Sequence, residues 1–106
     1  MKRIKESSGN VFADLGLPNA DELQARAALT HQVYVLIKRR GYTQKEAAVH
    51  LGLKQPDVSL LMRGRYTRFS TERLMRMLKA LGHDVEIAVR QAPRSRSVGR
   101  LSVVAA

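Results

Sequence analysis

The short run from Gln55 to Leu60 carries side chains whose chemistry suits the edges of DNA bases. The amide of Gln55 can pair bidentately with adenine, and the hydroxyl of Ser59 can donate or accept a hydrogen bond. Pro56 and Leu60 offer apolar contact to a thymine methyl group. Asp57 has two interpretations, because it could accept from a cytosine amino group or stabilise the N-terminus of a helix. These residues predict a surface that contacts bases.

Polar and basic side chains surround this run and could bind phosphate oxygens. They are Gln44, Lys54, Arg63, Arg65, Tyr66, Thr67 and Arg68. The net charge is +10, and residues 38–76 hold ten basic side chains against three acidic ones. Such an excess in a folded segment favours a polyanionic partner, although a membrane surface or a merely soluble basic face would also fit.

Two short helices joined by a tight turn would present these side chains. Thr43 and Glu46 have the spacing of a capping box, and Gly52 can end the first helix in a left-handed conformation. Pro56 suits the first position of the second helix, because its missing N–H would be unpaired there. We expect helices from Gln44 to Leu51 and from Gln55 to about Gly64.

The apolar positions of this segment match the packing of a helix-turn-helix. A small residue, Ala48, stands where two steeply crossing helices approach, and Leu53 follows the glycine of the turn. Val58 and Leu61 return an apolar face to the first helix. An ordinary helical hairpin without DNA function is the alternative, but the basic excess falls on this same segment.

The flanking sequence predicts a helical bundle and one strand. Asn19 and Glu22 suggest a capped helix over residues 20–40, and Ser70 a further helix over residues 71–81. Residues 84–90 alternate between apolar and polar side chains, which is the signature of a strand. The fold class is therefore all-α with a short C-terminal β-strand. The domain spans residues 20–90, between a flexible segment at 1–19 and a disordered basic tail at 91–106.

The helix-turn-helix sequence resembles a known family. The run from Thr43 to Gly64, TQKEAAVHLGLKQPDVSLLMRG, and the run from Phe69 to Leu74, FSTERL, are similar to the XRE family of λ-repressor-like DNA-binding domains. The flanks GNVFADLGL at 9–17 and LGHDVEI at 81–87 resemble its HigA-type antitoxins. The resemblance implies a repressor of its own operon that neutralises a RelE/HigB-like toxin. A stand-alone or phage-type repressor, or a neutralising protein that binds no operator, are the alternatives.

The toxin would dock on large apolar side chains that precede the first helix or begin it. They are Val11, Phe12, Leu15, Leu17 and Leu23. A segment this short cannot bury them by itself, so we expect it to order against a partner. The alternative is that it folds back onto the protein's own first helix.

The predicted strand suggests a homodimer. A single strand leaves its backbone groups unpaired, and a helical bundle has no sheet edge to receive it. We expect Val85, Ile87 and Val89 to pair across a two-fold axis with the same residues of a second copy, which predicts a palindromic operator in double-stranded DNA. The strand could instead lie alone on its bundle or pair with the toxin.

Several classes of function are not expected. There is no catalytic constellation and no phosphate loop, the three histidines lack metal-ligand spacing, and cysteine is absent, so we expect no enzyme activity, metal or cofactor. No apolar stretch is long enough for a membrane span, and residues 1–6 do not resemble a signal peptide. A bacterial cytoplasmic, nucleoid-associated protein is expected.

Overall fold

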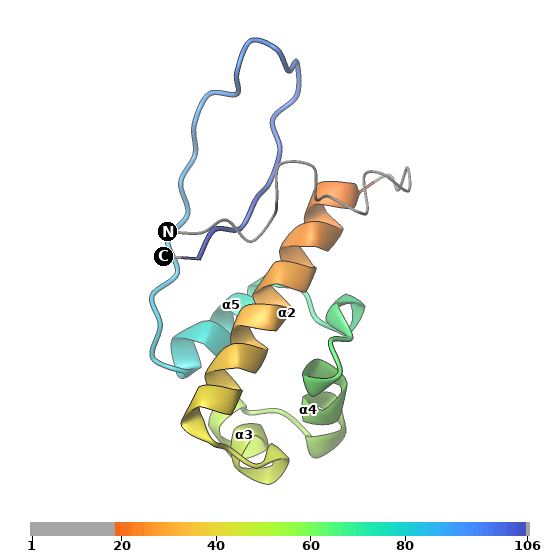
Figure 1. Ribbon diagram of the computed structural model, residues 1–106, viewed down its shortest axis with the longest axis vertical. Helices are drawn as coiled ribbons and strands as arrows, with labels where there is room; N and C mark the ends of the chain where they lie inside the picture. Colours follow the sequence, from red (N-terminus) through yellow and green to blue (C-terminus); the bar gives the residue numbers. More distant parts are fainter. Residues whose placement is uncertain (1–18, 106) are drawn as a thin grey trace.

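The computed structural model describes residues 19–105, which contain four α-helices and one 3-10 helix. In chain order these are α2 (Ala20–Arg40), α3 (Gln44–Leu51), α4 (Gln55–Met62), η1 (Tyr66–Arg68) and α5 (Thr71–Ala80). The long helix α2 is the spine, and α5, η1 and α4 all pack against it (Figure 1). The expected helical bundle is confirmed, with helix bounds close to those predicted.

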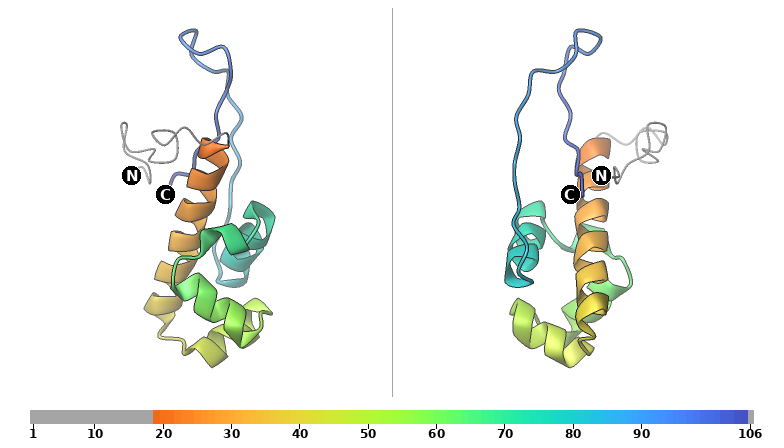
Figure 2. Two further views of the ribbon diagram at one scale, coloured as in Figure 1. Left: turned by 90° about the vertical axis from the view of Figure 1, so that its right-hand side faces the viewer. Right: turned by 60° about the vertical axis from the view of Figure 1, so that its left-hand side comes forward.

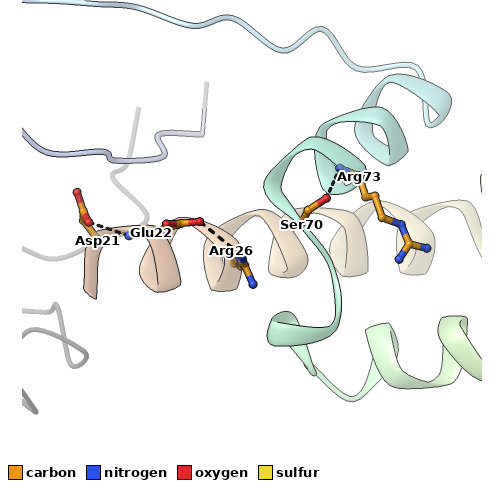
Figure 3. Close-up of polar contacts among 5 residues, drawn as sticks. All are labelled: Asp21, Glu22, Arg26, Ser70 and Arg73. Carbon is orange, nitrogen blue, oxygen red and sulfur yellow. Dashed lines mark hydrogen bonds and ion pairs between the residues drawn. The ribbon is translucent and has the colours of Figure 1, made fainter. Parts of the chain in front are cut away.

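The start of α2 departs from the prediction. The side chain of Asn19 makes no capping bond, and its backbone angles of φ −118° and ψ 46° are not the extended ones of an N-cap. Instead, the Oδ1 atom of Asp21 accepts the backbone N–H of Glu22 at 2.9 Å, and the Glu22 carboxylate pairs with Arg26 at 3.5 Å (Figure 3). Asp21 thus takes the Glu22 N–H that the Asn19 side chain was expected to accept, and Arg26 takes the Glu22 carboxylate. The capping box predicted at residues 19 and 22 is therefore wrong.

One apolar core holds the bundle together. The largest side chains that are less than 2% exposed are Phe69, Ile37, Leu61, Leu74, Leu81, Val33 and Val58. They come from α2, α4, α5 and the segments beside η1 and α5. Burying such side chains is worth about 1.5–3 kcal/mol each, so this shared core fixes α4 relative to the spine.

Helix α5 begins as predicted. The hydroxyl of Ser70 accepts the backbone N–H of Arg73 at 3.1 Å (Figure 3). The helix ends at Ala80, one residue before the expected end, and Leu81 is its C-cap. The Nη2 atom of Arg40, from the last turn of α2, donates to the carbonyl of Leu81 at 2.6 Å. This contact ties the C-terminal ends of α2 and α5 together.

The chain after α5 makes a long excursion. It extends past the N-terminal end of α2, turns, and returns beside that helix (Figures 1 and 2). Residues 84–90 pair with no segment in the described part of the chain, so the expected strand is not formed in the single molecule. The returning limb contacts the bundle, because Val103 packs against the core and the N–H of Leu101 donates to Asp21 Oδ2 at 2.9 Å.

Candidate nucleic-acid interface

The first helix of the pair, α3, begins with a complete capping box. The N–H of Glu46 donates to Thr43 Oγ1 at 3.1 Å, and the N–H of Thr43 donates to Glu46 Oε1 at 2.9 Å. These bonds from the Thr43 backbone and hydroxyl, with His50 one turn further along α3, hold the pKa of Glu46 below its ordinary value. The predicted start of this helix is confirmed, and it places Gln44 at an exposed helix N-terminus.

The turn between α3 and α4 depends on Gly52. Its φ of 66° is left-handed, while a Cβ placed there would meet nothing within 4 Å, so the requirement for glycine is conformational rather than steric. The next N–H, of Leu53, donates to the carbonyl of Ala48 at 2.9 Å. The small residue expected at the helix crossing, Ala48, is half-buried against the core. Its neighbour Ala47 is the fully buried one, because α3 packs against α5 as well as against α4.

The second helix, α4, buries one face in the core and presents the other to solvent. Val58 and Leu61 have no exposed surface, which fixes the orientation of the helix. Gln55 and Pro56 are exposed at its N-terminus. Ser59 and Leu60 are partly exposed, so all four predicted base-contacting residues have accessible surface. Pro56 is the second residue of α4 rather than the first, and its missing N–H still falls among those that the helix leaves unpaired.

Apart from Gln44 at the start of α3, the predicted phosphate-binding residues lie at both ends of α4. Lys54 is its N-cap, and the group from Arg63 to Arg68 follows its C-terminus. The side chains in this set are exposed except for the half-buried Tyr66. The Nε atom of Arg63 donates weakly to the carbonyl of Ser59, at 3.4 Å. The structure therefore places this basic set beside the exposed face of α4.

The positive charge of this face has no acidic counterpart in an ion pair. Within residues 19–105 the ion pairs join Arg26 to Glu22 and Arg76 to Glu72, on α2 and α5. The cations of residues 54–68 take part in neither of them. An uncompensated basic surface of this kind attracts phosphate through charge-assisted hydrogen bonds.

Sequence reasoning missed a contact that braces the segment between α2 and α3. The Nη1 atom of Arg40 donates to the hydroxyl of Tyr42 at 3.2 Å, and the Tyr42 ring stacks on His50 with centroids 4.4 Å apart and planes at 7°. His50 is exposed yet stacked on Tyr42. No periodicity signals a pair eight residues apart across a turn, so only the structure reveals it.

The remaining predicted site residues are divided between two regions. Val11, Phe12, Leu15 and Leu17 lie outside the described residues. Leu23 is half-buried on the second turn of α2. In the segment expected to form a dimer, Val85 is half-buried against the core, whereas Ile87 and Val89 are 77% and 91% exposed.

Residues 19–105 contain neither a cluster of metal ligands nor a helix that could cross a membrane. These residues contain no group of three or more histidine, cysteine, aspartate or glutamate side chains arranged to hold a metal ion. None of the helices in this range combines the length and the apolar character that crossing a membrane requires.

Comparison with known proteins supports the assignment of α3 and α4 as a helix-turn-helix. The profile of a helix-turn-helix domain family matches residues 11–90. A solved structure described as an XRE-family transcriptional regulator is similar to this chain, with 46% sequence identity and a TM-score of 0.77. The match covers 84% of this chain and 100% of that one. No curated protein sequence matches significantly.

Proposed function

This chain belongs to the XRE family of helix-turn-helix proteins, and on that premise we propose that it represses transcription by inserting α4 into the major groove of DNA. The observation that carries the proposal is the orientation of α4. Its buried residues Val58 and Leu61 turn Gln55 and Ser59 toward solvent, between the exposed Lys54 at one end of the helix and the exposed arginines of residues 63–68 at the other. A helix-turn-helix domain is a binding module, which agrees with the expectation that the protein is not an enzyme.

Gln55→Ala tests whether α4 reads bases. It should cost about 1–3 kcal/mol on a duplex selected by the wild type from a random pool, and little on random DNA, because it removes a base contact and no buried atom. Gln44→Ala is the matched control, since it shortens the same kind of side chain at the start of α3 and should weaken both duplexes alike. Titration by fluorescence anisotropy measures both. Equal losses for Gln55→Ala on the two duplexes would show that Gln55 touches only the backbone.

The finer proposal is an antitoxin that represses its own operon in the bacterial cytoplasm, on the nucleoid, and neutralises a RelE/HigB-like toxin. It is supported by the resemblance of residues 9–17 and 81–87 to HigA-type antitoxins, and by the large apolar side chains that precede α2. The half-buried Leu23 on α2 would continue this docking surface.

The double variant Phe12→Ala, Leu15→Ala tests toxin neutralisation. It should abolish rescue of cells that express a RelE/HigB-like toxin neutralised by the wild type, while operator affinity stays within about threefold, or ~0.7 kcal/mol. Val98→Ala, at a 74% exposed position, is the apolar control. Unfolding of the double variant, seen by circular dichroism, would show that these residues belong to the core. Unchanged rescue by the double variant would move the toxin contact away from Phe12 and Leu15. Failure of the wild type itself to rescue would favour a stand-alone or phage-type repressor, and rescue without operator binding a purely neutralising protein.

We also propose that the protein acts as a homodimer on a palindromic operator. The exposed side chains of Ile87 and Val89, on an extended segment with no pairing partner among the described residues, support an intermolecular strand. Two copies related by a two-fold axis would then present two α4 helices about one DNA turn apart.

A further inference from the structure

The arginine arm, defined as residues 90–100, carries a second concentration of positive charge. It contains Arg90, Arg94, Arg96 and Arg100, and residues 90–106 include no acidic side chain. We propose that this arm is a second DNA contact, which binds the phosphates of the duplex that flanks the operator. The proposal rests on the DNA-binding function above, and it assigns a role to a region that the helix-turn-helix does not use.

The arm is held at both ends rather than hanging free. Val85 precedes it and Val103 follows it, and both pack against the bundle core. Leu101 donates its N–H to Asp21 Oδ2, and within the arm the N–H of Arg96 donates to the carbonyl of Pro93 at 3.0 Å. A loop that is closed in this way loses less conformational entropy on binding than a free tail would, so its arginines can contribute net affinity.

The arm's arginines have no anionic partner in the described chain. The ion pairs of residues 19–105 lie on α2 and α5. Arg90, Arg94 and Arg100 are exposed, and Arg96 is half-buried. Between them stand mainly small or polar residues, including Ser95 and Ser97, whose hydroxyls are also phosphate donors. The arm has no aromatic residue of the kind that anchors peptides in a membrane interface, which favours phosphates of a nucleic acid.

The position of the arm indicates which part of the DNA it would contact. It projects beyond the N-terminal end of α2, whereas α3 and α4 lie toward the other end of that helix (Figures 1 and 2). The described residues extend 47 Å along their longest axis, a distance equal to roughly 14 base pairs of B-form DNA at about 3.4 Å per pair. The arm therefore lies outside the short segment that one recognition helix can cover. The proposal requires the long axis of the bundle to lie along the duplex held by α4, and the arm then lies over phosphates outside the operator.

The test compares two duplexes of equal length that contain the same operator. In one, the flanking phosphates are replaced by uncharged methylphosphonates. The arm variant is Arg94→Gln, Arg96→Gln, Arg100→Gln. On the fully charged duplex, its slope of log K against log salt should be shallower than that of the wild type by about 3 per protomer, because each lost phosphate contact removes about 0.9. On the duplex with neutral flanks, the two proteins should have equal slopes.

A matched variant separates this proposal from the helix-turn-helix function. Arg65→Gln, Arg68→Gln should lower the slope by about 2 on both duplexes, because these contacts lie beside α4. If that variant binds like the wild type, the proposed function fails. The arm proposal fails if the arm variant keeps the wild-type slope on charged flanks, or if it loses equally on both duplexes. It also fails if the arm variant loses affinity for single-stranded RNA but not for the operator duplex.

Discussion

At the residue scale, Glu46 should make the stability of the helix-turn-helix depend on pH. Its pKa is lowered in the folded protein by the Thr43 N–H, by the Thr43 hydroxyl and by His50. A carboxyl whose pKa falls on folding stabilises the fold above its unfolded pKa, and that stabilisation is lost as the pH falls through the folded value. The contribution of Glu46 should therefore be complete above about pH 5 and decline below its ordinary pKa of 4.5.

Glu46→Gln tests this coupling, because glutamine keeps an oxygen that can accept the Thr43 N–H but carries no charge. The wild type should unfold at higher urea concentration than the variant at pH 6, and the difference should shrink steadily towards pH 3. A difference that is the same at both pH values would show that the charge of Glu46 does not contribute to the cap.

The two predicted capping boxes show how far single residues can be interpreted from spacing. Thr43 and Glu46 form the box, whereas Asn19 and Glu22, at the same spacing, do not. The difference lies in the neighbours: Arg26 stands one turn after Glu22 and pairs with its carboxylate. Spacing identifies which groups can meet, but the outcome depends on competing partners within the same turn.

At the element scale, residues 84–90 test the proposed dimer. Ile87→Pro removes a backbone donor that a strand ladder would need, at a position that is 77% exposed and therefore unimportant for the monomer core. Sedimentation should show a monomer in place of a dimer, and binding to the full operator should weaken far more than binding to a half-site. Val98→Pro, at an exposed β-branched residue outside the predicted strand, should leave the dimer intact. If the variant remains dimeric, the two-fold contact lies on the helix faces and not on residues 84–90.

Helices were predictable and the C-terminal region was less so, for a physical reason. The periodicity of Leu74, Met77, Leu78 and Leu81 is local, and all four residues are buried. The pairing of residues 84–90 depends on a partner that the alternation of side chains does not identify. Nor does any local pattern indicate that Leu101 bonds to Asp21, since the two residues lie 80 positions apart in the chain.

At the scale of the whole molecule, composition predicted a polyanion partner but not where it would bind. The charge excess in residues 38–76 pointed to the helix-turn-helix, and the exposed cations beside α4 agree with it. The separate excess in residues 90–100 had no role in that interpretation. Only the path of the chain reveals that the arginine arm lies beyond the N-terminal end of α2, whereas α3 and α4 lie towards its C-terminal end (Figures 1 and 2).

The bond between Asp21 and Leu101 also has a consequence for the order in which the protein is assembled. Every helix of the bundle is complete by Ala80, and after the cap residue Leu81 its core receives only the packing of Val85 and Val103 from the rest of the described chain. Closing a loop of 80 residues is slow relative to local helix contacts, and synthesis proceeds from the N-terminus. We therefore expect the helical bundle with its helix-turn-helix to fold first, on the nascent chain. The arm should then close onto an already folded bundle, so removing the Asp21 carboxylate is expected to loosen the arm without unfolding the helices.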